Sequence, residues 1–379
     1  MEQVITFVGL DTHKETITAA LAVGGRDGEV RSLGRIANRP AAIERLARDL
    51  AQRYGRLRFS YEAGPCGYGL YRQLHRLGHE CIVAAPALIP RRPGDRIKTD
   101  RRDSLKLARQ DRAGELTAVW VPDVEDEAMR DLVRARAAAV AAVTRVRQQL
   151  QGLLLRNGVV YEGQTRWTRR HRSWLAGLRF EPPAQQIVLD EYRRAHAEAE
   201  ARRDRLTAAL ERLMAGWKRA PLVGALQAMR GVALVTAATL VAEIGDFRRF
   251  SHPRQLMAYL GQVPSENSSG PRVRRGGITK AGNGRVRRVL TEAAWTYLAK
   301  PRRSVALEQR RGGLPPAVRA IADKAETRLA TRFRHLLAAG KQRPLAVTAV
   351  AREMIGFLWA IAHAIEPATG NSPLDASAA

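Results

Sequence analysis

The stretch VITFVGLDTHKETITAALAVGGRDGEVRSLGRI, residues 4–36, decides the fold of the N-terminal part of the chain. It holds three runs with strand-forming Val, Ile, Thr or Leu, at residues 4–11, 16–23 and 29–36, joined by short polar or glycine-containing connections. Short runs of this kind, bounded by turn residues, are typical of β-strands. We therefore expect three consecutive strands that lie next to each other in one sheet.

Helix-like and strand-like segments alternate after residue 40. Apolar residues recur at helical spacing in the helix-like segments, and Gly55 and Gly78 close two of them. Three adjacent strands followed by this alternation predict an α/β domain over residues 1–122, in which a mixed sheet is flanked by helices. The further elements expected in this domain are helices over 41–55, 68–78 and 99–114 and strands over 57–63 and 80–86.

The rest of the chain has helical patterns. Two long, arginine-rich segments predict an antiparallel hairpin or coiled-coil arm over residues 123–220, with the basic, aromatic piece WTRRHRSWLAGLRFEPP as its turn. Glycine-punctuated helical patterns over residues 221–367 predict an all-α C-terminal domain, which includes a helix–turn–helix over 226–245. The polar residues 368–379 are typical of a disordered tail.

The composition restricts the class of protein. The chain has 379 residues, with 64 Lys and Arg against 37 Asp and Glu, a net charge of +27. Such an excess indicates a polyanionic partner, nucleic acid ahead of a membrane surface. With only Cys66 and Cys81, a disulfide framework and a Cys-rich zinc site are excluded, which suits the cytoplasm. The apolar run at residues 354–365 is too short to span a bilayer and predicts a buried helix.

Four acidic residues lie at strand ends or on one helix face, where they can form a metal site. Asp11 ends the first strand in GLDTHK, Glu62 ends the fourth in YEAG, and Asp100 and Asp103 share one face of a helix in KTDRRDS. Neighbouring strand ends meet at a sheet edge, so the four carboxylates can cluster around Mg²⁺ or Mn²⁺ and support phosphoryl transfer. The alternatives are turn residues at strand ends and helix-dipole partners behind an N-cap at Thr99.

A basic, glycine-rich stretch, SENSSGPRVRRGGITKAGNGRVRR, spans residues 265–288. Cations and a closely approaching backbone suit a phosphodiester, although a flexible basic surface loop is the alternative. A serine that attacks DNA phosphorus conserves bond energy in a phosphoserine link. Ser265, Ser268 and Ser269 all qualify by position, and Ser269 precedes Gly270. A helix is expected from about Lys280 onward. The candidate phosphate-binding cations are Arg272, Arg274, Arg275, Lys280, Arg285, Arg287 and Arg288.

These motifs carry a family resemblance. The ordered set GLDTHK, YEAG and KTDRRDS resembles the DEDD transposases of bacterial insertion sequences, a family that includes the Piv-type DNA invertases. The downstream stretch from RGVALVTAATL to RVLTEAAW, which contains residues 265–288, resembles the C-terminal transposase domain of the same family. The resemblance covers roughly residues 4–300.

The resemblance implies more than the patterns do. It implies a RuvC-like domain of ribonuclease-H type in which Asp11, Glu62, Asp100 and Asp103 form a metal-binding tetrad. It also implies that Ser269 is the catalytic serine, although Ser268 duplicates it at the neighbouring position. The implied activity is that of a DNA transposase or recombinase with a serine–DNA intermediate. Implied partners are donor and target DNA, further copies of the chain that complete the site, and a structured bridge RNA held by the arm and the RuvC-like face.

Two other functions fit part of the sequence. A Holliday-junction-type endonuclease would use the four acids and water, which leaves the match over residues 265–288 unexplained. A non-catalytic DNA- or RNA-binding protein would use the basic segments, which leaves four acids without a role in a strongly basic chain. For a transposase, we expect a cytoplasmic location at the bacterial nucleoid.

Overall fold

The computed structural model describes residues 4–90, 94, 99–270, 272–300 and 304–365. By internal contacts the chain divides into two compact units, Met1–Pro122 and Asp123–Ala379. The expected disordered tail, residues 368–379, lies outside the described residues.

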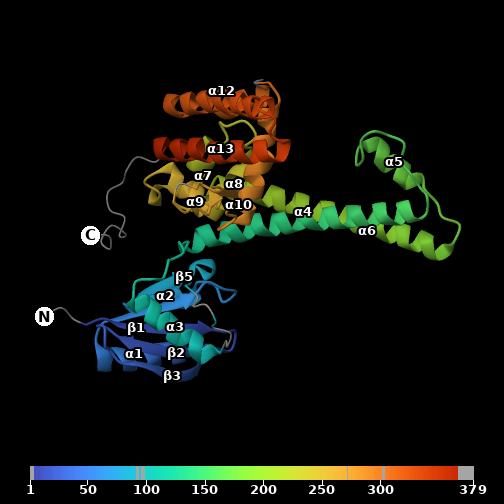
Figure 1. Ribbon diagram of the computed structural model, residues 1–379. Helices are drawn as coiled ribbons and strands as arrows, with labels where there is room; N and C mark the ends of the chain where they lie inside the picture. The colour runs from blue at the N-terminus through green and yellow to red at the C-terminus, as the bar shows by residue number, and fades with distance from the viewer. Residues whose placement is uncertain (1–3, 91–93, 95–98, 271, 301–303, 366–379) are drawn as a thin grey trace. The chain divides into compact units, whose positions relative to one another are not determined.

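The first unit contains a five-stranded sheet in the order β3-β2-β1-β4-β5 (Figure 1). The pairs β1–β2 and β2–β3 are antiparallel, whereas β1–β4 and β4–β5 are parallel. The predicted mixed sheet and its three consecutive strands are therefore confirmed. The strands are β1 (Thr6–Thr12), β2 (Thr16–Val23), β3 (Val30–Ala37), β4 (Leu57–Glu62) and β5 (Glu80–Ala84).

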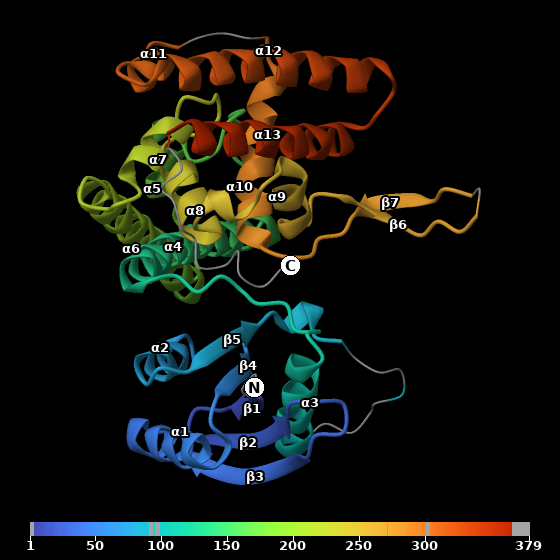
Figure 2. The ribbon, with the colours of Figure 1, turned by 90° about the vertical axis from the view of Figure 1, so that its left-hand side faces the viewer.

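Three helices flank this sheet, as predicted: α1 (Pro40–Tyr54), α2 (Gly69–Arg76) and α3 (Asp100–Arg112). Helices α1 and α2 lie on one side of the sheet and α3 on the other (Figure 2). The side chain of Thr99 accepts a hydrogen bond from the Arg102 backbone N–H, so the predicted N-cap is confirmed. This cap begins α3 at Asp100.

Gly9 in the middle of β1 lets α3 lie directly on the sheet. A Cβ atom at Gly9 would lie 2.2 Å from the Ser104 carbonyl oxygen and 2.4 Å from the Ala108 nitrogen. Since side chains alternate along a strand, Gly9 and Asp11 face the same side of the sheet, the side that α3 covers. The missing side chain thus brings the start of α3 close to Asp11.

We expect Gly9→Ala to destabilise the first unit and to displace Asp100 from Asp11. Overpacking of a close contact costs about 1–3 kcal/mol. The two nearest atoms that the new methyl group would meet belong to the backbone of α3, so the clash is relieved only if the whole helix moves away from the sheet. Thermal unfolding followed by circular dichroism measures the loss. Gly69→Ala is the matched control, because no atom lies within 4 Å of its added Cβ. Equal melting temperatures for the two variants would contradict the prediction.

Asp111 is a buried carboxylate between α3 and the sheet. It is 2% exposed, and Arg58 Nε lies 3.1 Å from its Oδ1. Burial raises the pKa of Asp111 to about 6, and the charge of Arg58 only partly offsets this effect. The folded unit therefore prefers the protonated acid.

This raised pKa predicts a pH dependence of stability. Between about pH 4 and pH 6 the folded unit holds a proton that the unfolded chain has released, so the contribution of protonated Asp111 is lost as the pH rises through this window. Asp111→Asn should remove that loss. Its free energy of unfolding relative to wild type should rise by on the order of 3 kcal/mol from pH 4 to pH 7. Urea unfolding at both pH values tests this prediction, with Asp49→Asn, at an exposed position, as the control. The prediction is wrong if the free energy of unfolding of Asp111→Asn differs from that of wild type by the same amount at both pH values.

In the second unit, two long helices form an arm, α4 (Val124–Arg156) and α6 (Pro183–Met214), which lie side by side (Figure 1). The segment expected to be only the turn between them contains a further helix, α5 (Arg169–Gly177), capped by Thr168. The prediction missed α5 because only His171 and Leu175 of its residues are buried, too few to give a helical apolar pattern. Coiled-coil packing of the arm stays a prediction.

The prediction of an all-α C-terminal domain is wrong, because β6 (Pro264–Glu266) and β7 (Arg275–Ile278) pair as the two antiparallel strands of a β-hairpin. Neighbouring glycines and serines disfavour a helix there, and the paired strands satisfy the backbone instead. The rest of this part is helical. Its helices are α7 (Ala220–Leu226), α8 (Leu234–Ile244), α9 (Pro253–Tyr259), α10 (Gly284–Ala294), α11 (Val305–Arg311), α12 (Pro316–Ala338) and α13 (Arg343–Ile365), with short 3₁₀ turns at Phe247–Arg249 and Trp295–Leu298.

The apolar run at residues 354–365 belongs to α13, which is longer than predicted. Its 23 residues are long and apolar enough, by length and composition, to cross a membrane, so the argument from shortness is wrong. The helix nevertheless lies in the core of the unit, where Val350, Met354 and Leu358 are at most 1% exposed. The predicted buried helix is therefore confirmed.

Candidate active site

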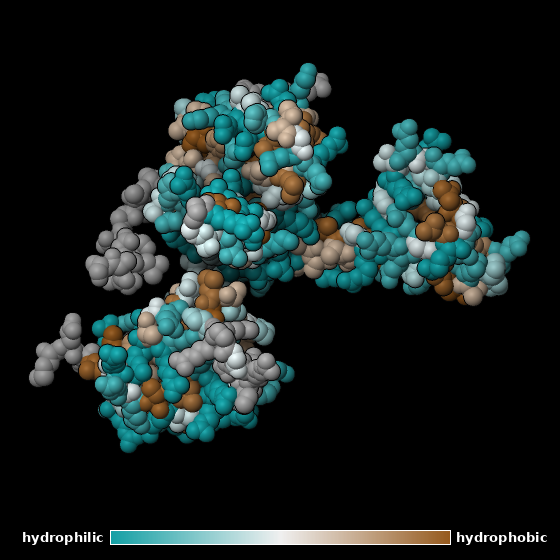
Figure 3. Space-filling model, in the orientation of Figure 1, coloured by the Kyte–Doolittle hydropathy of each residue, from teal (hydrophilic) through white to brown (hydrophobic). Residues whose placement is uncertain are grey.

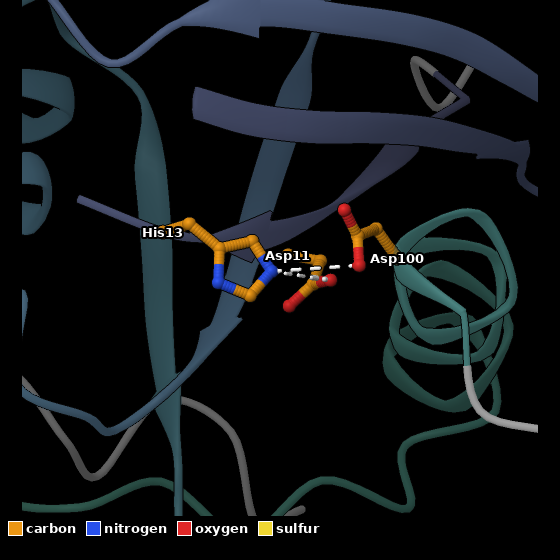
Figure 4. Close-up of side chains that lie close together, drawn as sticks. All are labelled: Asp11, His13 and Asp100. Atoms are coloured by element: carbon orange, nitrogen blue, oxygen red, sulfur yellow. Dashed lines mark ion pairs between the residues drawn. The ribbon is translucent and has the colours of Figure 1, made fainter. Parts of the chain in front are cut away.

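Asp11, His13 and Asp100 form a compact group at one edge of the sheet (Figure 4). One ligand atom from each lies within 4.8 Å of the others. His13 Nε2 is 3.4 Å from Asp11 Oδ2 and 3.5 Å from Asp100 Oδ1. Asp11 comes from the end of β1 and Asp100 from the start of α3. The structure thus joins two of the four predicted acids.

His13 was not among the predicted site residues. It lies two positions after Asp11, in the same GLDTHK motif, and this i, i+2 spacing is the signal that could have identified it. Arg35, on β3, was also missed; its guanidinium lies 3.1 Å from Asp100 Oδ2. Because Arg35 and Asp100 are 65 positions apart, no local pattern connects them.

The group is electrostatically suited to a cation. Burial raises the pKa of Asp11, and the nearby carboxylates of Asp100 and Asp103 raise it further, while His13 acts in the opposite direction. A divalent cation would relieve this repulsion. Two carboxylates fit Mg²⁺ or Mn²⁺, and the imidazole adds a nitrogen donor that transition metals accept. The donor set therefore fits a divalent metal ion.

Glu62 and Asp103 lie outside this group of mutually close ligand atoms. Glu62 is exposed and directly follows Tyr61, which is paired with Leu10, so Glu62 and Asp11 occupy corresponding positions on neighbouring parallel strands. Asp103 is one turn further along α3 and acts on Asp11 through its charge. A tetrad around one metal centre stays a prediction for these two residues.

The hairpin β6–β7 carries the candidate serines, and their hydroxyl groups differ. Ser268 Oγ donates to Glu266 Oε1 at 3.0 Å and accepts from the Arg274 backbone N–H at 3.2 Å. Ser269 is exposed at the turn, and its hydroxyl makes no hydrogen bond to another described residue. Gly270 next to it has φ +56°, a conformation that favours glycine. Of these two serines, only Ser268 has a hydroxyl bonded to other described residues of the hairpin, whereas Ser269 is held there by its backbone, which pairs with Arg272.

Known proteins resemble the chain over both regions. A model described as the transposase IS116/IS110/IS902 family matches residues 223–307, and a second transposase model, for DEDD transposases of IS110, matches residues 8–157. The putative transposase y4qE of Sinorhizobium fredii is 49% identical over 357 residues, which are 94% of this chain and 88% of the relative.

The chain belongs to the IS110 family of transposases. The transposase for insertion sequence element IS1533 of Leptospira borgpetersenii is 33% identical over 342 residues, 87% of this chain and 96% of that protein. A probable family 20 transposase of Pseudomonas aeruginosa is 30% identical over 241 residues, 60% and 68% of the two chains. The protein is therefore a DNA transposase or recombinase, an enzyme that acts on DNA, and the predicted family is confirmed.

The predicted cations of this transposase have different surroundings. Arg275 lies 3.2 Å from Glu266, and Arg288 lies 3.1 Å from Glu292. Arg287 donates to the backbone oxygens of Leu260 and Ala281, so it ties the base of the hairpin to α9. The exposed cations without an ion pair to a described residue are Arg272, Arg274, Lys280 and Arg285.

The base of the hairpin is tightly built. A Cβ at Gly261, φ +64°, would lie 2.0 Å from the Ala281 oxygen, and one at Gly282, φ +74°, would lie 2.0 Å from the Tyr259 oxygen. These left-handed positions delay the helix expected from about Lys280, so α10 begins only at Gly284, after its N-cap. The transposase thus presents the exposed serine on a firmly seated hairpin.

One buried carboxylate fixes that N-cap. Asn283 donates to Glu243 Oε2 at 2.7 Å, and Arg134 on α4 binds both oxygens of Glu243, at 2.7 and 2.8 Å. Burial alone raises the pKa of Glu243, but the hydrogen bonds and charge of Arg134 outweigh it and hold that pKa below its usual value. In the transposase, Glu243 therefore joins the arm to the base of the hairpin.

Proposed function

We propose that this transposase cuts and rejoins DNA through a covalent Ser269–DNA intermediate, with a divalent cation, Mg²⁺ or Mn²⁺, at the acidic residues of a RuvC-like domain. The observation that carries the serine assignment is the difference between the two hydroxyl groups. Ser268 Oγ is engaged by Glu266 and Arg274, whereas Ser269 is exposed and its hydroxyl makes no hydrogen bond to a described residue. A nucleophile needs such freedom to reach phosphorus.

The proposed step exchanges one phosphate ester for another. Ser269 Oγ attacks a backbone phosphorus and loses its proton, the bond from phosphorus to the leaving DNA oxygen breaks, and that oxygen takes up a proton. A DNA hydroxyl then attacks the phosphoserine phosphorus and loses its proton, the bond from phosphorus to Ser269 Oγ breaks, and Oγ takes up a proton. One phosphate ester thus replaces another, so no high-energy cofactor is needed. Exposed Arg272 and Arg274 flank the serine and balance the charge that grows on the phosphate oxygens.

Asp11 and Asp100 are the residues that would hold the cation, with Glu62 and Asp103 completing the acidic set. A bound divalent cation supplies Lewis-acid stabilisation of the attacking and leaving oxygens. His13 contacts both central carboxylates and Arg35 contacts Asp100, so these two side chains orient the acids. Burial, and after it the charges of Asp100 and Asp103, raise the pKa of Asp11, and a bound cation would offset both effects, which supports this assignment.

The partners beyond DNA also belong to this proposal. The net charge of +27 supports a second polyanion, a structured bridge RNA that selects donor and target DNA. We also propose a homo-oligomer in which acidic and serine sites from different subunits meet. Such a complex would act at the nucleoid in the cytoplasm.

A denaturing gel tests the covalent step. Wild-type protein, Mg²⁺, DNA carrying the element ends and RNA transcribed from the element's flanks are incubated and then denatured. We expect a protein–DNA adduct that withstands denaturation, and its loss in EDTA. Strand cleavage without any adduct would instead support a Holliday-junction-type endonuclease in which water attacks.

A further inference from the structure

The tip of the arm contains a hollow of about 220 Å³ that the proposed chemistry does not use. The last turns of α4, residues 159–161 and α5 line it. Apolar surface gathers at this end of the arm among hydrophilic surface (Figure 3), and Leu155 and Val160 at the hollow are 74% and 64% exposed. Pockets for drug-sized ligands are about 300–1,000 Å³, so this smaller hollow suits a single ring system.

Aromatic rings form one wall of the hollow. The rings of Tyr161 and Trp174 lie 5.0 Å apart at 53°, and Tyr161 meets His171 edge-on at 4.7 Å. Both Tyr161 and Trp174 are partly exposed. Flat π surfaces at this spacing can contact the face of another ring.

His171 adds an unused hydrogen-bonding group to the lining. The residue is 2% exposed, and its Nδ1 has no hydrogen-bond partner among the described residues. Burial, with the charge of Arg166, lowers the pKa of His171, so at neutral pH the ring is uncharged, with one donor and one acceptor nitrogen. A buried polar atom without a partner is unfavourable, and a ligand in the hollow can supply the partner.

One arginine lines the hollow, and others lie near it in the sequence. Residues 156–180 contain six arginines and one acidic residue, Glu162. Arg172 is paired with Glu200 on α6 and supports the arm. Arg166 lines the hollow, and Arg169 and Arg170 begin α5; all three are exposed and have no ion pair to a described residue. This charge is therefore available to a polyanion.

Trp167 lies next to the lining residue His171, with their rings 5.1 Å apart. Trp167 has φ +67°, uncommon for a residue other than glycine, and is held by stacking on His196 at 4.7 Å and by Arg147 at 4.6 Å from its ring. Arg147 also donates to His196 and to Glu200. These contacts hold Trp167 against His171, which lines the hollow.

We propose that this hollow binds one unpaired nucleobase of a single-stranded or looped nucleic acid. The base lies against Tyr161 and Trp174, its edge bonds to His171, and neighbouring phosphates contact the free arginines. The aromatic hollow has the size of one base, and the arginines without an ion pair suit the phosphate, so together they match the two chemical parts of a nucleotide. The proposal rests on the nucleic-acid partner of the proposed function and is independent of Ser269 and the metal.

Fluorescence anisotropy of the full-length protein in EDTA tests this proposal without any cleavage. The probes are short labelled oligonucleotides: oligo-uridine RNA, oligo-thymidine DNA, and the same DNA backbone without bases. Wild type should bind the base-bearing DNA more tightly than the abasic strand. Trp174→Ala should weaken base-bearing probes between roughly 5-fold and 150-fold and leave the abasic strand nearly unchanged. Trp295→Ala, an exposed tryptophan on the 3₁₀ turn Trp295–Leu298, is the matched control and should bind as wild type does.

Two further variants separate the parts of the site. His171→Phe keeps a ring in the wall but removes the edge contact, so affinity should fall and differences among base types should shrink. Arg166→Ala should weaken base-bearing and abasic strands alike and reduce the salt dependence by about one unit of slope. Circular dichroism confirms that each variant is folded.

The outcomes are distinct. Preference for RNA would assign the hollow to a guide RNA, and preference for DNA to a displaced DNA strand; either supports an unpaired base. Equal binding of base-bearing and abasic strands by wild type, or unchanged affinity in Trp174→Ala, overturns the proposal. If Trp174→Ala keeps its affinity for the oligonucleotides but forms a smaller oligomer in light scattering, the hollow is an interface between copies of the chain. Loss of the serine adduct alone has no bearing on it.

Discussion

Ser269→Ala is expected to abolish both the protein–DNA adduct and strand exchange, with a rate loss on the order of 10⁴-fold or more, the scale seen when an enzyme loses its nucleophile. The exposed Ser269 hydroxyl makes no hydrogen bond to a described residue, so its removal leaves no described contact of the hairpin broken. DNA affinity should therefore change little. Quantifying adduct and product on denaturing gels, with DNA affinity measured in parallel, checks this.

Ser268→Ala is the matched control for that experiment. It removes the contacts with Glu266 and with the Arg274 backbone, so the hairpin should loosen and activity should fall by roughly tenfold, within the range for a displaced catalytic group. The adduct should remain. If instead Ser268→Ala loses the adduct and Ser269→Ala keeps it, the assignment of the nucleophile is reversed.

Asp11→Asn should have the second largest effect, because it removes the central carboxylate of the acidic group. We expect metal-dependent cleavage to fall by about 10³-fold or more, on the scale of losing a group that stabilises transition-state charge. Binding of DNA should remain, since the cations at residues 272–288 are unchanged. Titration with Mn²⁺ followed by electron paramagnetic resonance measures the metal directly.

The stability of this variant gives a second, independent measurement. Burial and neighbouring carboxylates raise the pKa of Asp11, so its charge opposes folding when no cation is bound. In EDTA, Asp11→Asn should therefore melt at or above the wild-type temperature. With Mg²⁺ at about 100 times its Kd, wild type should gain about 2.7 kcal/mol and the variant should not.

Asp27→Asn, an exposed acid in the turn before β3, is the control and should keep both the metal response and the activity. Equal stabilisation of Asp11→Asn and wild type by Mg²⁺ would show that the cation does not bind at Asp11. If Asp11→Asn loses DNA binding but still binds the metal ion, Asp11 supports the structure of the DNA-binding surface and is not a metal ligand.

The first unit could be predicted closely because its signals are local. Strand β2 was expected over 16–23 and occupies Thr16–Val23. Its residues are almost all buried, as a short, continuous apolar run predicts for a strand covered on both faces. The N-cap Thr99 and the closing Gly55 are likewise set by a few neighbouring residues. Patterns of this kind depend on the chain within one or two turns.

The hairpin and the tip of the arm could not be predicted in this way. Strands β6 and β7 are only three and four residues long, and the polar stretch around them has no alternation to reveal them. Their base depends on Gly261 lying against Ala281, a contact that no local pattern contains. Helix α5 was hidden for a similar reason, since most of its residues are exposed and only two are buried.

The sequence by itself determined the mixed sheet, the order of Asp11, Glu62, Asp100 and Asp103, and a basic segment with three serines, because these follow from nearby residues. Only the tertiary structure decided that Asp11 and Asp100 meet at His13, through a helix that lies on Gly9, and that the Ser268 hydroxyl is engaged within the hairpin. Distances between residues far apart in the chain depend on strand register and on how closely a helix can approach a sheet. Those quantities exist only once the chain is folded.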